Sequence, residues 1–405
     1  MQPAATPLEP IAWTAWLLQA TRLVRSVWQG ALVVDFALYL KALAWSAVQI
    51  SVVLSAALLL GAMLTMLLGP LSDRFGRRRF LLVYDAAQGL AALVAWWTPA
   101  ALPLAMAAVV GGFGRGGNGA AGPFSPVEQA WMAQCVPASR RGMFYSLNAA
   151  LGFFGMAIGA VLAGAPGWAW GAAPPAAAYR PLFLLTAVLS AVTFVMIAVA
   201  RDDEAGRGKV VEEDPRERVR ENGLVRRLVL ANLLNGAGLG LSGPLVTYWF
   251  ALKFDHGPAS IGAMMAVGFV LAGVASLLAG RLSRRVGVVR AVVLMRLVGL
   301  VLLVALPFAG SFMLASVLYV ARAVMNRGTT GARSAVNMGI VRANRRGFSS
   351  AASNVALQVP RAIGPVFAGA LFQSGFLAAP FLVAAVFQAG YVWVYDRSFR
   401  GVELK

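Results

Sequence analysis

The sequence has almost none of the side chains that build metal sites and disulfides. Its 405 residues include one cysteine, Cys135, and one histidine, His256. A single cysteine cannot form an intramolecular disulfide, and a structural zinc site needs several cysteine or histidine ligands. Nucleotide-binding loops and nucleophile elbows are also missing, which argues against an ATP-driven pump or a hydrolase. We therefore expect no cofactor, no metal and no enzymatic activity.

Charged residues are scarce as well, and acids are the scarcer kind. Only 13% of the residues are charged, whereas 59% are hydrophobic and the mean hydropathy is +0.72. The chain is therefore too apolar for ordinary soluble domains. The formal net charge of +19 suggests nucleic acid as a partner, but the basic residues lie in short stretches between apolar runs rather than on one soluble face. The composition predicts a polytopic membrane protein that does not bind nucleic acid.

The apolar runs predict about twelve transmembrane helices, because a hydrocarbon core about 30 Å thick is crossed by about 20 apolar residues. Windows of this kind lie near residues 22–43, 47–70, 79–98, 101–122, 143–164, 181–200, 226–251, 258–280, 289–308, 311–333, 349–373 and 376–396. The expected fold class is all-α, with two pseudo-symmetric six-helix bundles in residues 1–200 and 226–405. A charged cytoplasmic linker, residues 201–225, is expected between them. The polar N-terminal stretch lacks the pattern of a removable signal peptide.

Arginines indicate the orientation in the membrane. They gather in alternate loops, and the positive-inside rule places such loops in the cytoplasm. Both termini are then cytoplasmic, and the expected location is the plasma (inner) membrane. The linker mixes both signs of charge without apolar periodicity, which is typical of a solvated segment and leaves a regulatory or lipid-contacting role open.

The two predicted halves repeat one another. GPLSDRFGRRRF and GRLSRRVGVVR begin at Gly69 and Gly280, an offset of 211 residues. Two longer stretches that begin with RRG, at Arg140 and Arg345, align at an offset of 205. In transporters built from such repeats, the substrate site forms at the repeat interface near the bilayer midplane. The duplication favours a transporter over a receptor or scaffold.

GPLSDRFGRRRF resembles the signature of the major facilitator superfamily between its second and third helices, and the resemblance extends over the whole chain. It implies a gate on the cytoplasmic side formed by Gly69, Asp73, Arg74, Gly76 and Arg77. The alternative is plain positive-inside topology. In the second copy Arg284 replaces Asp73, so we expect that copy to keep the turn without the acid. GFFGMAIGAVLAG is similar to the fifth-helix pattern of the drug:proton antiporter branch, although Ala160 stands where that pattern has proline.

Asp35 is the acid expected to lie deep in a span, whereas Asp85 and Glu128 are expected near helix ends. An intramembrane acid is a functional hypothesis by default. The resemblance places the first and fourth helices at the central cavity, so the expected partner of Asp35 is Arg115. Burial favours the protonated carboxyl and an arginine favours the ionised one, so this pair is expected to couple protons. A purely structural pairing is the alternative.

Polar residues inside the spans define a candidate substrate cavity. Its members are Gln29, Asp35, Arg115, Asn118, Asn235, Tyr248, Asn326 and Arg327. The alternative for the uncharged members is hydrogen bonding between helices. Arg115 and Arg327 occupy equivalent places in the two halves and are candidates for an anion clamp. Arg333 is expected to pair with Glu128.

Small residues in the fifth and eleventh helices predict a close packing seam, made of Gly155, Gly159, Gly164, Gly364, Pro365 and Gly369. The function expected is proton-coupled export of a small amphipathic or lipophilic molecule by alternating access. The alternative is a transporter of organic or inorganic anions, followed by a non-transporting receptor or scaffold. The expected partners are a small-molecule substrate, protons and membrane lipid, and the expected state is a monomer.

Overall fold

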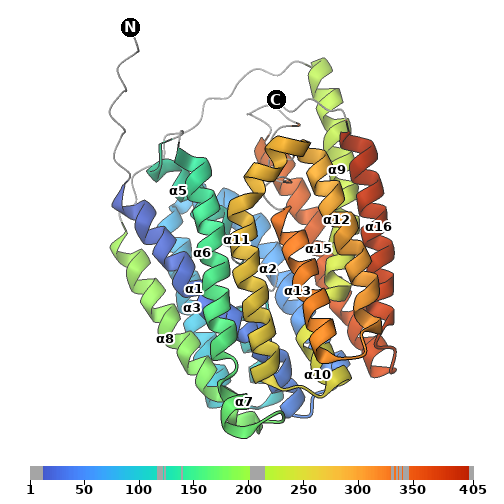
Figure 1. The fold of residues 1–405 in the computed structure, drawn as a ribbon. Coiled ribbons are helices and arrows are strands. Elements are labelled where there is room, and N and C mark those ends of the chain that lie inside the picture. Colours follow the sequence, from blue (N-terminus) through green and yellow to red (C-terminus); the bar gives the residue numbers. More distant parts are fainter. Residues whose placement is uncertain are drawn as a thin grey trace.

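The computed structural model describes residues 12–115, 122, 125–137, 140–200, 215–329, 333, 336, 340 and 346–400, and its regular elements are helices (Figure 1). The N-terminal half, as named here, consists of α1 (Trp13–Ala42), α2 (Ala47–Phe75), α3 (Arg77–Trp97), α4 (Ala101–Gly111), α5 (Ser125–Cys135), α6 (Arg141–Leu162), α7 (Ala165–Trp170) and α8 (Arg180–Val199). The C-terminal half consists of α9 (Pro215–Ser242), α10 (Val246–Phe254), α11 (Pro258–Val286), α12 (Val288–Ala305), α13 (Phe312–Gly328), α15 (Arg346–Gln373) and α16 (Ala379–Phe399).

The helices are long and apolar enough to cross a membrane. Within the described ranges, nine helical segments meet that condition, which confirms an all-helical polytopic membrane fold. The expected windows 101–122, 311–333 and 376–396 are not among the nine. The first is interrupted because α4 ends at Gly111. In the second, α13 is 17 residues long and carries Arg322 and Arg327, which lower its hydropathy.

The predicted linker contains the beginning of a helix. Residues 201–214 lie outside the described residues, but α9 begins at Pro215, inside the predicted interval 201–225. Near the N-terminus, α1 begins at Trp13 and is 30 residues long. The first span is therefore longer than the window 22–43 that hydropathy alone indicates.

The repeated charged motif lies on helix ends rather than in an extended loop. Gly69, Asp73 and Arg74 belong to the last two turns of α2, and their side chains lie outside the described part of the structure. Gly76 ends α2 at φ 91°, and Gly287 ends α11 at φ 88°. Side chains with a Cβ rarely adopt such positive φ values, so both copies require glycine at this turn. The expectation that the second copy keeps the turn is confirmed.

Glycines bring helices into close contact inside each half. A methyl group at Gly159 of α6 would lie 1.8 Å from the carbonyl oxygen of Val27 in α1. At Gly155 it would lie 2.5 Å from the carbonyl oxygen of Leu23, and at Gly364 of α15 it would lie 2.4 Å from the backbone of α9. These three members of the predicted seam therefore pack helices within a half, not between halves.

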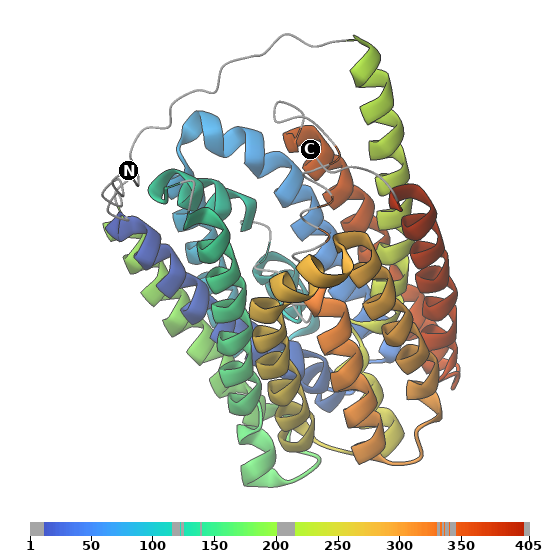
Figure 2. The same cartoon turned by 45° about the horizontal axis from the view of Figure 1, so that its top comes forward.

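The halves meet through α2 with α15 and α6 with α11, which lie side by side. Gly369 of α15 faces Ser51 of α2, where a methyl group would lie 2.3 Å from the hydroxyl oxygen. Gly164 follows α6, and its backbone lies close to Gly262 of α11. Pro365 lies inside α15. Figure 2 shows the two halves on opposite sides of the molecule, with these helices along the junction.

Two hydrogen bonds between the halves lie at one end of the molecule. We call it the α7 end and the opposite one the α5 end, after the helices at the bottom and top of Figure 1. At the α7 end, Lys41 donates to the carbonyl of Ala251 at 3.4 Å, and the backbone N–H of Val48 donates to Gln373 at 3.3 Å. Both hydrogen bonds join one half to the other, so the halves are held together here.

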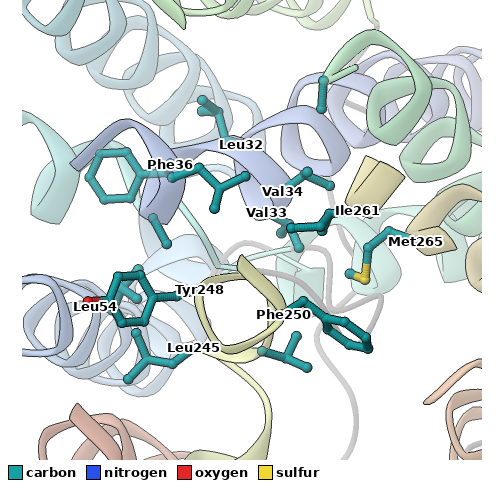
Figure 3. Close-up of a cluster of buried hydrophobic side chains, with 14 of the residues drawn as sticks. Leu32, Val33, Val34, Phe36, Leu54, Leu245, Tyr248, Phe250, Ile261 and Met265 are labelled. Carbon is teal, nitrogen blue, oxygen red and sulfur yellow. The ribbon is translucent and has the colours of Figure 1, made fainter. Parts of the chain in front are cut away.

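Apolar packing reinforces this junction. Side chains of α1 and α2 meet those of α10 and α11 in a buried cluster drawn in Figure 3, whose labelled residues are Leu32, Val33, Val34, Phe36, Leu54, Leu245, Tyr248, Phe250, Ile261 and Met265. Tyr248, an expected cavity residue, belongs to this cluster and is 6% exposed. It therefore contributes to the contact between halves.

Candidate functional site

Asp35 lies about two turns before the end of α1 and is buried, with 1% of its surface exposed. Among the described residues, neither of its carboxylate oxygens has a hydrogen-bond partner. Aromatic residues surround this part of α1, because Tyr39, one turn further on, packs on Tyr179 and Phe183 of the α8 region at ring distances of 6.0 and 5.1 Å.

Arg115 is held by backbone carbonyls rather than by a carboxylate. Gly112, which follows α4, adopts the left-handed conformation, and the chain then turns so that Arg115 reaches back. Its Nε donates to Gly112 O and its Nη1 to Ala57 O, both at 3.2 Å. Gly61 of α2 leaves the necessary space, since a methyl group there would lie 2.2 Å from Nη1. The expected bond between Arg115 and Asp35 is not formed in this structure.

A second arginine approaches Arg115 from the other half. Arg361 of α15 is buried, and Arg115 lies close enough to repel it electrostatically. The Arg361 Nη1 donates to Gln358 at 3.3 Å, while its Nε has no hydrogen-bond partner in the described part of the chain. Sequence reasoning missed this residue, although an arginine inside an apolar span satisfies the criterion that singled out Asp35.

Two more buried arginines lie on α13. The Arg322 Nη2 donates to the hydroxyl of Ser242 at 3.0 Å. The guanidinium carbon of Arg327 lies 4.7 Å from the ring centre of Phe269 and 5.6 Å from that of Phe153, which belongs to the other half. Arg327 therefore lies at the junction between halves, as its place in the sequence repeat predicts.

The N-terminal half contains a buried ion-pair cluster that the sequence did not reveal. Arg25 of α1 donates to both oxygens of Asp85 in α3, at 2.9 and 3.1 Å, and also bonds Glu128 of α5. Asp85 and Glu128 are 2% and 4% exposed. Glu128 lies in the first turn of α5 and Asp85 about two turns into α3, so their positions agree with the expectation of helix ends, although both are buried. The partner of Glu128 is Arg25 rather than Arg333.

The remaining cavity candidates do not gather around Asp35. Gln29 lies near Gly122 in the N-terminal half, and Asn326 faces Gly299 of α12. Asn235 of α9 is fully buried inside the C-terminal half, where it accepts hydrogen bonds from Gln388 and Arg296. Asn118 lies outside the described residues. The uncharged candidates that can be placed thus mainly join helices within one half.

The free-energy cost of burying the central arginines can be compared with the free energy that their contacts return. Removing an ion from water costs several kcal/mol even after the protein relaxes, and a desolvated cation–π contact contributes about 2 kcal/mol or somewhat more. A hydrogen bond to a charged group contributes about 1.5–3 kcal/mol. The contacts of Arg115, Arg322 and Arg361 therefore compensate their burial only in part. An anion between the halves would supply the missing interaction, because guanidinium groups match carboxylate and phosphate oxygens.

The chain matches a known protein family along nearly all of its length. The family model of the Major Facilitator Superfamily matches residues 23–227 and 228–400. An uncharacterized membrane protein of Saccharomyces cerevisiae is 22% identical over 431 residues, which cover 96% of this chain and 94% of that protein.

Solved structures share the fold. A bacterial homologue of the human lysosomal transporter Spinster, in an inward-facing and occupied conformation, superposes with a TM-score of 0.76 and 13% identity, covering 98% of each chain. The nucleoside transporter NupG superposes with a TM-score of 0.73 and 10% identity, covering 95% of this chain and 100% of its own. A D-xylose-proton symporter superposes with a TM-score of 0.68 and 15% identity, covering 92% of this chain and 96% of its own.

Proposed function

The chain belongs to the major facilitator superfamily of membrane transporters, which makes it a transporter rather than an enzyme, and from this premise we propose that its substrate is an organic or inorganic anion. Residues 1–200 and 226–405 are the two bodies that move, and residues 201–225 connect them. The anion is held between the halves and reaches alternate sides of the membrane as they rock.

The observation that carries this proposal is the buried Arg361 of the C-terminal half, whose Nε has no hydrogen-bond partner among the described residues and whose charge is repelled by Arg115 of the N-terminal half. Like charges at a buried junction repel, and an anion between them would turn that repulsion into attraction to both. Arg327, over Phe153 of the opposite half, adds a third positive charge at the junction. The same charges would repel the lipophilic cations that a multidrug exporter carries, so the anion alternative is favoured over amphipathic drugs.

Proton coupling through Asp35 is the second part of the proposal. Its support is the buried position of Asp35 and the absence of a hydrogen-bond partner for its carboxylate among the described residues. An ionised carboxylate is costly to bury without a partner, so Asp35 holds a proton in this conformation and releases it when movement of α1 admits water or a cation. The neighbouring fold of a proton symporter is compatible with such coupling.

The conformation also suggests the direction of access. Contacts between the halves at the α7 end close that side, and the positive-inside rule makes it the outer side. We propose that the structure is an inward-facing state in the plasma (inner) membrane, from which the substrate is loaded for export. The Asp73 motif at the α5 end then acts as the gate that closes in the outward-facing state.

A ligand screen on the purified protein tests the anion proposal. Thermal unfolding is measured with succinate, inorganic phosphate, tetraphenylphosphonium and xylose, because a ligand at 100 times its dissociation constant stabilises by about 2.7 kcal/mol. Stabilisation by an anion is expected. Arg361→Gln should lower the affinity for that anion by about 10-fold to 100-fold, which corresponds to the loss of one charge-assisted hydrogen bond.

The matched control is Arg400→Gln, which removes an exposed arginine that is paired with Asp396 on α16. It should leave the anion affinity unchanged. Stabilisation by tetraphenylphosphonium and by neither anion would contradict the anion proposal and return the preference to an exporter of lipophilic cations.

A further inference from the structure

The C-terminal half contains a second cluster of arginines, the buried Arg296 and the half-buried Arg333, away from the junction between halves. It occupies positions that the sequence repeat relates to the ion-pair cluster of the N-terminal half. Arg296 lies 211 residues after Asp85, and Arg333 lies 205 residues after Glu128, which are the two offsets of the repeat. The two acids of the first half are therefore replaced by two arginines in the second.

Contacts in this C-half arginine cluster are few and long. The Arg296 Nη1 donates to Asn235 at 3.4 Å, and the Arg333 Nη2 donates to Asn232, also at 3.4 Å. Both guanidinium groups lie over the ring of Tyr391, at 5.3 and 5.8 Å from its centre. Two positive charges thus lie over one aromatic ring. At the equivalent positions, the N-terminal half has two carboxylates.

No acid compensates Arg296 in the described part of the chain. The ionisable groups that act on it are Tyr391, Arg333, Arg322 and Tyr395. Asp396, next to Tyr395, is bonded to Arg400 instead. Glu221 is buried on α9, but eleven residues of helix separate it from Asn232, a distance of roughly 16 Å along the axis.

Several polar atoms of the cluster also have no hydrogen-bond partner among the described residues. They are Arg296 Nε, Asn235 Nδ2 and the hydroxyl oxygens of Tyr391 and Tyr395. All four side chains are at least nine-tenths buried. Each of these groups has an N–H or O–H to donate, and buried donors are rarely left unpaired in native proteins.

We propose that the C-half arginine cluster binds an oxyanion of the phosphate type, separately from transport at the central arginines. The guanidinium groups provide the charge and the forked donors that phosphate oxygens prefer, and the tyrosine hydroxyls and the Asn235 amide add donors. A free phosphate or the phosphate group of an anionic lipid has this chemistry. The bound anion takes the part that Asp85 and Glu128 take in the other half, as the counter-ion that stabilises the bundle.

The test uses the full-length chain carrying Arg361→Gln, so that anion binding between the halves is weakened and the effect of the C-half arginine cluster can be separated from it. Thermal unfolding and native mass spectrometry are measured after delipidation, with added inorganic phosphate, with phosphatidylglycerol, and with phosphatidylcholine as the neutral-headgroup comparison. Two further substitutions are then introduced separately. Arg296→Met removes one charge, and Asn232→Asp supplies a carboxylate in the place of the amide that contacts Arg333. Arg400→Gln is the surface control.

We expect phosphate or phosphatidylglycerol to bind and to raise the unfolding temperature. Phosphatidylcholine should not displace the bound anion, and Arg400→Gln should leave its affinity unchanged. Arg296→Met and Asn232→Asp should each weaken binding at least about tenfold. Asn232→Asp should in addition raise the unfolding temperature of the anion-free protein, because the new carboxylate compensates the cluster from within. An effect of inorganic phosphate identifies a free anion, whereas an effect of phosphatidylglycerol alone identifies a lipid.

Two results would overturn the proposal. The first is that neither probe binds to the Arg361→Gln protein. The second is that binding is unchanged by both Arg296→Met and Asn232→Asp. Neither result bears on the central site, because anion transport there is measured on the chain that retains Arg361.

Discussion

The guanidinium of Arg25 in α1 bonds the carboxylate of Asp85 in α3 at 2.9 Å, and both side chains are 1% exposed. The same guanidinium bonds Glu128 of α5, so one arginine joins three helices of the N-terminal half. Breaking a buried ion pair leaves an uncompensated charge, which costs more than the net stability that the pair provides.

Arg25→Met should therefore destabilise the protein by about 3–5 kcal/mol, because two buried carboxylates lose their partner. Thermal unfolding in detergent measures the effect. Adding Asp85→Asn and Glu128→Gln to the same chain should recover much of the loss, since neither buried carboxylate is then left without its partner. A single Arg25→Met variant as stable as the Arg400→Met control would contradict this account of the cluster.

Substitution of Gly159 tests the packing of α1 on α6. Gly159→Ala should disrupt the fold or lower its unfolding temperature strongly, because the added methyl group would lie 1.8 Å from the Val27 carbonyl oxygen. Gly223→Ala in α9 is the matched control, since nothing lies within 4 Å of a methyl group there. It should be neutral or stabilise by up to about 1 kcal/mol, because alanine is the better helix former. Equal effects of the two changes would contradict the close contact.

A disulfide across the α7 end tests whether this junction opens during transport. Gly167 of α7 and Ala259 of α11 belong to different halves, and a Cβ at Gly167 would lie 2.9 Å from that of Ala259. A disulfide needs about 3.8 Å between its Cβ atoms, so a small shift allows the bond. In a Cys135→Ser chain, Gly167→Cys with Ala259→Cys should cross-link under oxidation. Transport should then fall at least about tenfold and return on reduction.

Two controls complete the cross-linking experiment. Each single cysteine variant in the Cys135→Ser chain should transport equally with and without oxidant. If the fully cross-linked protein transports at the rate of its reduced form, the α7 end does not open and the proposed rocking of the halves is wrong.

Asp35→Asn tests proton coupling. The neutral amide has nearly the same shape as the carboxyl, so the protein should fold with unchanged or higher stability, since no buried carboxylate remains without a partner. Transport in proteoliposomes should lose its dependence on an imposed pH gradient, while substrate binding stays within about threefold of the original. Asp396→Asn, on the half-exposed surface of α16, should retain that dependence. A gradient effect that survives in Asp35→Asn would exclude Asp35 as the coupling group.

Hydropathy and the sequence repeat were sufficient for the fold class, because a membrane-crossing helix needs only a long apolar run. The turn at Gly76 and its copy at Gly287 also followed from the sequence, since a local positive φ selects glycine whatever lies around it. The burial of Asp35 followed from its place in an apolar window.

The partners of the charges were decided by the tertiary structure. The fourth span bends at Gly112, which turns Arg115 toward the Ala57 carbonyl and away from Asp35, and no spacing in the sequence measures that turn. The rule that singled out Asp35, a charge inside an apolar window, would also have singled out four arginines: Arg25, Arg296, Arg322 and Arg361. Which of them faces an acid, a ring or another arginine depends on how helices rotate against one another. That rotation is set by packing at residues such as Gly159 and Gly364, so only the folded molecule separates the compensated cluster of one half from the uncompensated cluster of the other.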